Sequence, residues 1–254
     1  MDFDFSDEQV AVRDLAALIV TRHAPGGLLR LAHRPGYITD YGHALSGLTA
    51  AFDLLGDPAL IDAAQRIADE AIDRLRADDG GFFTTPAGRA DLPRRSREQV
   101  DNAYPAGQNA LAVGLIRLWN LTGLGRWRAI AEGIFASAAG VAGQAPTAVP
   151  TLLSAYGASR AGHLTAVVAG RDDDQRTREL LAACRRSWLP NLAVVPVERC
   201  RDRAWNCLEG RTAISEPQAL ICVGLVCLAP ARTADEVAQR LAEAERAAPS
   251  VPAS

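Results

Sequence analysis

The hydrophobic period of the chain changes near His163, and this change limits the folds that the sequence can adopt. Between residues 37 and 160, apolar side chains recur every three or four positions, the spacing of helices with one buried face. Beyond His163, short β-branched runs alternate with a helical pattern. The sequence therefore predicts a mainly α protein, a helical-hairpin array followed by a small C-terminal α/β subdomain.

Turn residues divide the first region into helices. Asp57 and Pro58 are typical of a helix start, whereas Gly56 and Gly123 are typical of helix ends. Pro93 excludes a continuous helix in the polar, arginine-rich stretch between the second and third helices. The expected helices cover residues 37–56, 58–75, 107–122, 124–140 and 146–159.

The second region predicts a β-α-β unit. Strands at 164–170 and 192–197 flank a helix at 173–187, so the two strands should lie parallel. A third strand over 219–228, which Gly224 can kink, precedes a last helix capped by Thr233. We divide the chain into an N-terminal helix and loop (1–36), a helical-hairpin domain (37–160), an α/β subdomain (161–248) and a disordered tail (249–254).

Composition excludes several classes of function. The chain has 27 arginines and no lysine. The absence of lysine excludes Schiff-base chemistry on a lysine, a phosphate-loop lysine and a lysine general base. A net charge of −3 argues against general nucleic-acid binding. The acidic start differs from a signal peptide, and no apolar stretch approaches the roughly 20 residues of a membrane span. We therefore expect a cytoplasmic protein without membrane partners or cofactors, whose five cysteines are reduced thiols.

Four ordered segments carry a resemblance to a known family. They are GGFFTTP (80–86), DNAYPAGQNALAVGLIRLWNLTG (101–123), LLAACRRSWLPNLAVV (180–195) and TAISEPQALICVGLVCLAP (212–230). Together they resemble the C-terminal portion of the YyaL and spermatogenesis-associated protein 20 type. The resemblance covers about residues 37–245 and implies a partial (α/α)6 toroid, similar to N-acylglucosamine 2-epimerases and six-hairpin glycosidases.

Two departures from that family matter. The family's thioredoxin-like domain and first half-barrel are missing here, so either a homodimer or a partner subunit is expected to complete the barrel, or the half-barrel serves another use. The family's Pro-Ser-Gly-Asn-Ser pattern also stands here as the sequence from Pro105 to Asn109, PAGQN, which loses a hydroxyl and lengthens an amide.

The strongest candidate site precedes and enters the helix at 107. The resemblance places such a segment at a central cavity. There Asp101 could act as a general base, while Asn102, Tyr104, Gln108 and Asn109 could bind a hydroxylated substrate. The alternative is that Asp101 caps a loop and Asn102 satisfies backbone groups.

A second candidate site is formed by Asp40, Tyr41 and His43. Imidazole titrates near neutrality, as acid–base chemistry requires, and Asp40 and His43 share a helical face on which they could pair. The alternative is a helix cap at Thr39 or Asp40 with a solvated or core histidine.

Three other side chains are candidates for substrate binding. Phe82 and Phe83 could form an apolar cavity wall, with core packing as the alternative. Arg97 could hold a carboxylate or phosphate group, with a solvated loop as the alternative.

Four cysteines fall within 28 residues: Cys200, Cys207, Cys222 and Cys227. The spacings are not those of a tight zinc knuckle, so buried apolar thiols are favoured over a zinc site and no metal is expected. Cys222 and Cys227 form a candidate redox pair that matches a cysteine pair in the resembling family. On one straight strand, however, positions five apart point to opposite faces.

The site residues predict an enzyme on a small polar, sugar-like metabolite, using acid–base isomerase, epimerase or hydrolase chemistry. Two alternatives remain open. One is a non-catalytic binding or partner protein that completes a barrel in trans. The other is a biosynthetic cyclase or isomerase acting on a non-sugar substrate.

Overall fold

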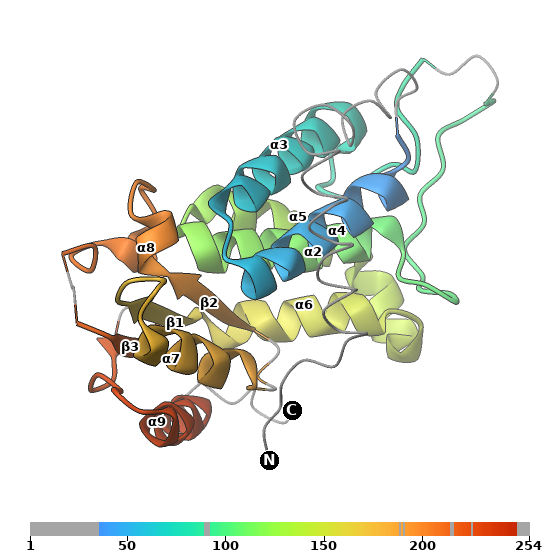
Figure 1. Ribbon diagram of the computed structural model, residues 1–254. Helices are drawn as coiled ribbons and strands as arrows, with labels where there is room; N and C mark the ends of the chain where they lie inside the picture. Colours follow the sequence, from blue (N-terminus) through green and yellow to red (C-terminus); the bar gives the residue numbers. More distant parts are fainter. Residues whose placement is uncertain are drawn as a thin grey trace.

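Helices make up the first part of the protein, and a small sheet with flanking helices makes up the second (Figure 1). The computed structural model describes residues 36–88, 92–187, 189, 191–213, 216–224 and 226–247. The helix and loop expected over 1–36, except its last residue, and the tail expected over 249–254 lie outside these ranges. The described elements are α2 (Ile38–Leu55), α3 (Pro58–Leu75), α4 (Gly107–Thr122), α5 (Gly125–Gln144), η2 (Pro146–Ala148), α6 (Pro150–Ala161), β1 (Leu164–Ala169), α7 (Gln175–Arg185), β2 (Leu192–Pro196), α8 (Val197–Cys200), η3 (Asn206–Leu208), β3 (Gln218–Val223), β4 (Val226–Cys227) and α9 (Ala234–Ala247).

The turn residues delimit the helices as expected. Gly56 ends α2 and Gly123 ends α4, each with a positive φ that favours glycine. Asp57 caps α3 because its carboxylate accepts a hydrogen bond from the backbone N–H of Ala59 at 2.9 Å. The mainly helical fold with a small α/β part is therefore confirmed.

The four strands of the described sheet lie in the order β2-β1-β3-β4. The predicted parallel pairing of β1 with β2 is confirmed, whereas β3 runs antiparallel to β1. The single strand predicted over 219–228 is wrong. Gly224 has a φ of 60° and reverses the chain, so that β4 folds back on β3 with Cys222 opposite Cys227.

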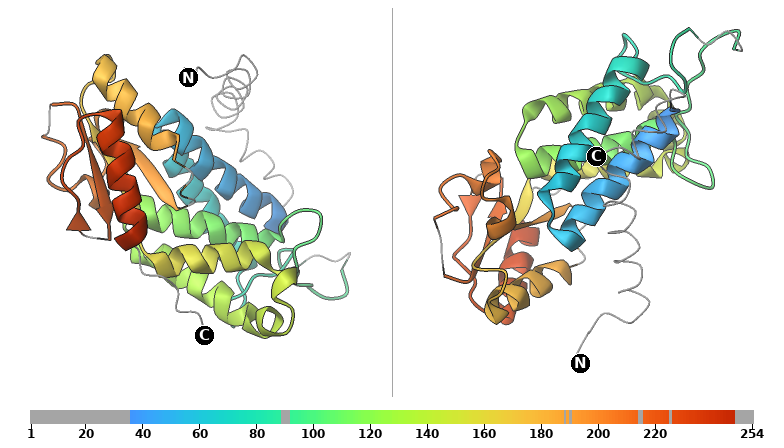
Figure 2. Two further views of the ribbon diagram at one scale, coloured as in Figure 1. Left: turned by 90° about the horizontal axis from the view of Figure 1, so that it is seen from below. Right: turned by 45° about the horizontal axis from the view of Figure 1, so that its top comes forward.

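The sheet buries both faces. On one face, Val167 and Val195 belong to the same hydrophobic core as α2 and α4. On the other face, Val168 and Val194 pack in a second core with α7 and α9 (Figure 2). This alternation is the period of two that a strand imposes. The first core extends across the boundary proposed between 160 and 161, and that boundary stays a prediction.

Helix α4 lies at the centre of the described structure. Every residue of α4 except Val113 and Arg117 is buried. Helices α2, α3, α5 and α6 contact it, as do β1, β2 and η3. A helix surrounded in this way must be almost uniformly apolar or carry polar side chains whose hydrogen bonds are made inside the protein.

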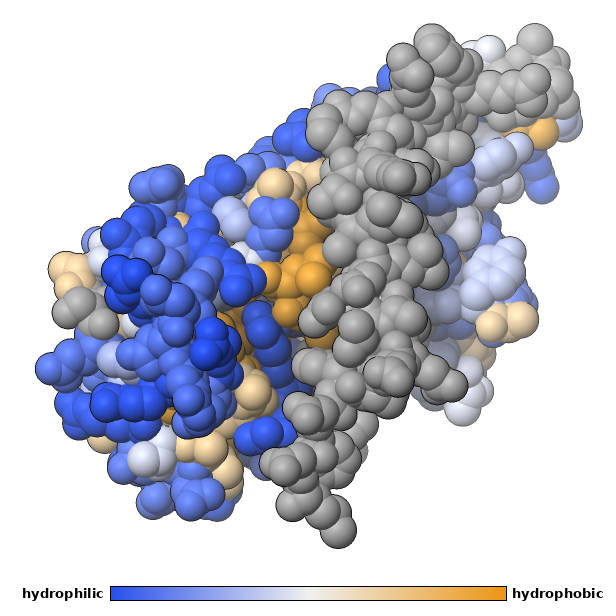
Figure 3. Space-filling view, in the orientation of Figure 1, coloured by the Kyte–Doolittle hydropathy of each residue, from blue (hydrophilic) through white to orange (hydrophobic). Residues whose placement is uncertain are grey.

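The face in Figure 3 shows hydrophilic residues over most of the α/β part and hydrophobic residues gathered between that part and the helices. Among the described residues, no helix combines the length and the apolar character that a membrane span requires.

Two glycines allow α2 and α4 to touch. A Cβ atom added to Gly42 would lie 2.1 Å from the carbonyl oxygen of Gly107, and one added to Gly107 would lie 2.4 Å from the backbone nitrogen of Thr39. Both obstacles are backbone atoms, which cannot move without separating the helices.

We expect Gly42→Ala to lower the free energy of unfolding by about 2 kcal/mol or more, because overpacking against backbone forces the helices apart. Gly47→Ala is the matched control. Gly47 is exposed on the same helix with nothing within 4 Å of an added Cβ, so alanine should stabilise the protein by about 0.5–1 kcal/mol. Urea unfolding of both variants measures the difference, and equal effects would contradict the close helix contact.

Candidate functional site

The Asp101 carboxylate ties the loop before α4 to two helices. Its Oδ1 accepts hydrogen bonds from the backbone of Ala106 and the side-chain amide of Asn109, both at 2.8 Å. Its Oδ2 accepts one from the backbone N–H of Thr151 at 2.9 Å. These contacts are those of a loop anchor, because both oxygens face donors within the protein. The general-base role of Asp101 stays a prediction.

His43 lies against the same loop. Its Nε2 is 3.2 Å from the carbonyl oxygen of Pro105, and its ring meets that of Tyr104 edge-on at 6.2 Å between centroids. Asp40 instead accepts a hydrogen bond from the backbone of Tyr37 at 2.8 Å. The structure therefore brings His43 close to the Asp101 loop but gives Asp40 and His43 different hydrogen-bond partners.

The Tyr41 hydroxyl stays protonated at neutral pH and acts as a hydrogen-bond donor. Its hydroxyl donates to Glu70 at 3.1 Å. Burial, reinforced by the negative charge of Glu70, raises the pKa of Tyr41 to about 12.

Three of the predicted substrate-binding side chains lie inside the protein. Gln108 and Asn109 have no exposed surface, and Phe82 is 1% exposed. Gln108 accepts a hydrogen bond from the backbone of Phe82 at 3.2 Å, and Asn109 donates to the carbonyl oxygen of Gln99 at 2.9 Å. Contact between these side chains and a substrate would require the loop to open.

The other predicted binding residues lie nearer the surface. Arg97 forms an ion pair with Asp79 and lies over the ring of Phe83 at 4.7 Å. The hydrogen bond from Arg97 is the main reason that the pKa of Asp79 lies below its usual value. Asn102 and Tyr104 are exposed and can reach a ligand.

We expect Asp101→Ala to lower the free energy of unfolding by about 2–4 kcal/mol, because it removes three hydrogen bonds to a carboxylate that is half-buried. Asn102→Ala is the control. Asn102 is the exposed neighbour, and its hydrogen bonds are long, at 3.4 and 3.5 Å, so it should change stability by less than about 0.5 kcal/mol. Thermal and urea unfolding test this. A stable Asp101→Ala protein would contradict the anchoring role.

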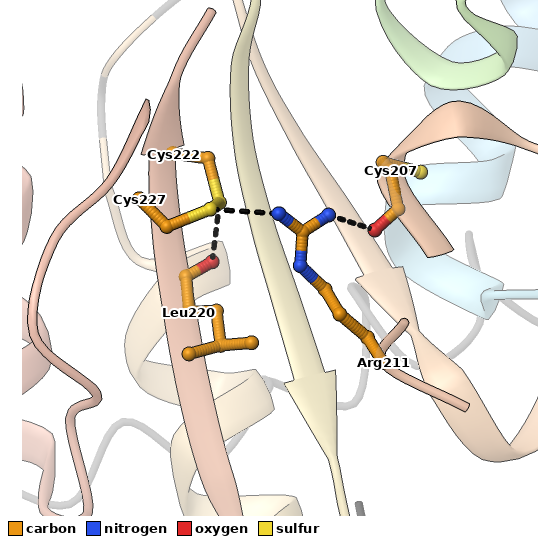
Figure 4. The surroundings of a disulfide bond; sticks show 5 residues. All are labelled: Cys207, Arg211, Leu220, Cys222 and Cys227. Carbon is orange, nitrogen blue, oxygen red and sulfur yellow. Dashed lines mark hydrogen bonds between the residues drawn. A yellow bond between two sulfur atoms is a disulfide. The ribbon is translucent and has the colours of Figure 1, made fainter. Parts of the chain in front are cut away.

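The cysteines depart from the expectation of five reduced thiols. Cys222 and Cys227 form a disulfide across the β3-β4 hairpin (Figure 4). The reversal at Gly224 removes the objection that these two side chains point to opposite faces. The zinc alternative does not fit, because two of the four sulfurs are bonded to each other. Within the described ranges, no group of three residues could hold a metal ion.

The three free cysteines, Cys184, Cys200 and Cys207, are buried. Burial raises the pKa of each thiol to about 12, so all three are protonated at neutral pH.

A cavity of about 250 Å³ lies at the C-terminal end of α4, opposite the end that carries the Asp101 loop. Polar groups from four separate segments meet in it. Its lining comprises Asn120, Gly123, His163, Thr165, Asn206, Cys207, Glu209, Arg211, Cys222 and Gly224. Sequence reasoning missed this site, because its members are far apart in the chain and form no motif.

His163 is partly buried at the wall of this cavity. Its ring lies 3.8 Å from that of Trp119 between centroids and hydrogen-bonds to the backbone of Asn120. Burial is the main reason that the pKa of His163 lies below its ordinary value of 6.5, and the nearby charge of Arg128 lowers it further. The imidazole is therefore neutral at pH 7. The Asn120 side chain, 3% exposed, has both polar atoms buried without a partner.

Arg211 supplies a positive charge to the cavity. One of its N–H groups donates to the carbonyl oxygen of Cys207, and its Nη2 lies 2.8 Å from Sγ of Cys227 (Figure 4). In the part of the chain that the structure describes, no carboxylate forms an ion pair with Arg211.

The lowered pKa of His163 predicts a loss of stability in acid. Below pH 6.5 the unfolded chain binds a proton at this residue before the folded protein does, so the free energy of unfolding falls from there down to the pKa of the folded state. His163→Gln should flatten the slope between pH 7 and 5.5. Urea unfolding at several pH values measures it, and parallel profiles would contradict the burial effect.

The fold and cavity define a class, a helical-hairpin protein closed at one end by a mixed α/β layer with a polar cavity at their junction. No family model matches the chain. It is similar to spermatogenesis-associated protein 20 of Homo sapiens, with 26% identity over 176 residues, 67% of this chain and 22% of that protein. The Rattus norvegicus protein is 26% identical over 175 residues, with the same shares. An uncharacterized protein of Caenorhabditis elegans is 23% identical over 159 residues, 62% of this chain and 22% of that protein.

The chain is therefore homologous to spermatogenesis-associated protein 20, as the four segments predict. It spans 22% of the length of these curated relatives, a share that fits a C-terminal portion.

Proposed function

We propose that the protein acts on a small polar, sugar-sized metabolite in the cavity at the C-terminal end of α4, by acid–base chemistry of isomerase, epimerase or hydrolase type. The observation that carries this proposal is the presence of His163, Glu209 and Arg211 around one cavity. A proton acceptor, a carboxylate and a cation are the groups that such chemistry requires. A volume of about 250 Å³ lies below the roughly 300–1,000 Å³ of pockets for drug-sized ligands, so the cavity suits only a small metabolite.

Each group has a distinct role. His163 is the proton acceptor, because burial keeps it neutral and its hydrogen bond to the backbone of Asn120 fixes the ring. Arg211 stabilises negative charge that develops on a substrate oxygen. Glu209 is exposed and offers a carboxylate that accepts hydrogen bonds, and Thr165 and Asn206 offer hydrogen bonds to hydroxyl groups.

The Asp101 loop is the competing location for the same chemistry. It lies beside His43 of α2, but its carboxylate is fully engaged by donors of the protein. The two locations lie at opposite ends of α4, so variants can separate them.

A screen of small sugars and sugar acids by thermal shift, followed by NMR detection of product, tests the proposal. For the substrate found, we expect His163→Gln to lower kcat by about 100-fold or more, since a general base contributes about 10²–10⁴. The matched variant His43→Gln should retain activity. If His43→Gln is inactive and His163→Gln is active, the chemistry belongs to the Asp101 loop. If no ligand binds, the metabolite proposal fails.

A partner protein that completes a helical barrel in trans is the second candidate. Leu153 and Tyr156 lie three positions apart on α6 and are 40% and 46% exposed. This pair offers an apolar surface on which a helix of a second copy or of another subunit could pack.

A cyclase or isomerase with a non-sugar substrate would use the same cavity as the first proposal. The cytoplasmic location also remains a proposal.

A further inference from the structure

The Cys222–Cys227 disulfide lies at the wall of the cavity, beside the cation Arg211. Cys222 belongs to the cavity lining, whereas Sγ of Cys227 accepts a hydrogen bond from Arg211 at 2.8 Å (Figure 4). Arg211 lines the same cavity as Cys222, and of the two sulfur atoms it is Sγ of Cys227 that accepts the hydrogen bond from this cation.

The position of this disulfide is poorly suited to stabilising the fold. It joins residues only five apart that already face each other across the β3-β4 hairpin, so the ring that it closes excludes few conformations of the unfolded chain. The sheet is held instead by the longer pairing of β1 with β2 and β3 and by helices on both faces.

We propose that this disulfide is a thiol–disulfide exchange site for a low-molecular-weight thiol that enters the cavity. The thiolate of the small thiol attacks Sγ of Cys222, a mixed disulfide forms there, and the bond to Cys227 breaks. The electron pair of that bond leaves with Cys227 as a thiolate, which the Arg211 guanidinium stabilises. A second molecule of thiol then attacks the mixed disulfide. The small thiols depart as their own disulfide, and Cys222 and Cys227 are left reduced.

The surroundings suit both reduced products. The Cys227 thiolate has Arg211 beside it, and a Cys222 thiol has the carbonyl oxygen of Leu220 at 3.8 Å as an acceptor. Cys207 also lines the cavity but cannot intercept the mixed disulfide, because its Sγ donates to the carbonyl oxygen of Leu121 and points away from the disulfide (Figure 4). The exchange therefore involves one pair of cysteines.

This inference does not depend on the metabolite proposal. Exchange requires the disulfide and Arg211 but not His163, whereas acid–base chemistry requires His163. His163→Gln should therefore lose any turnover of the metabolite and still exchange with the small thiol. Loss of exchange in a folded His163→Gln protein would contradict this separation.

The first experiment mixes the full oxidised chain with excess L-cysteine at pH 7 without oxygen and follows intact mass after acid quenching. We expect a transient mixed disulfide, located at Cys222 by peptide mapping, and then the dithiol. Arg211→Gln should slow the first step about ten-fold, because a nearby cation lowers the basicity of the leaving thiolate. Arg211→Lys should restore most of the rate. The control Arg232→Gln removes the same charge from an exposed position away from the cavity and should react like the wild type.

A second measurement does not require folded Arg211→Gln protein. In Cys222→Ser, the pH dependence of iodoacetamide alkylation reports the pKa of the Cys227 thiol, which should lie clearly below the ordinary value of about 8.5. A Cys227 thiol that titrates at the ordinary value overturns the proposal. So does a mixed disulfide that forms at Cys227, or an Arg211→Gln protein that folds and exchanges as fast as the wild type.

Discussion

The burial of α4 on all sides is the constraint on which the rest of the structure depends. Helices α2, α3, α5 and α6 and two strands contact it, so each of these elements is positioned by the same sixteen residues. Contact with α2 is close enough that glycine is required on both helices, at Gly42 and Gly107. The buried amides of α4 lie at its two ends, Gln108 and Asn109 at the first and Asn120 at the second, where loops and strands meet the helix. Both candidate sites lie at these ends.

The helices could be predicted well from the sequence, because their signals are local. Apolar spacing, the Asp57-Pro58 start and the glycines at 56 and 123 each act within one or two turns. The parallel pairing of β1 and β2 could also be predicted, since a crossover helix dictates it. The hairpin at Gly224 was missed because an apolar run of ten residues is typical of one strand, and only the backbone reversal shows that it is two.

The candidate site divides in the same way. Asp101, Asn109 and the loop between them are close in sequence, so their contact could be predicted. The sequence did not show that the Asp101 carboxylate would anchor this loop by accepting hydrogen bonds from the protein. The cavity at the other end of α4 could not be predicted. His163 comes to Asn120 and Arg211 only because β1 starts beside the end of α4 and β3 pairs with β1 in one register. That register depends on packing across the whole sheet rather than on any short motif.

The hydrophobic core shared by the helices and one face of the sheet bears on how such a chain can be recombined. Residues of β1 and β2 fill the same core as α2 and α4. A cut near residue 161 would therefore leave each fragment with an uncovered apolar surface rather than with a unit that folds alone. Insertion or exchange of the α/β part should succeed only when α4 travels with it. The unit to exchange intact in protein engineering is therefore the helical array together with its sheet.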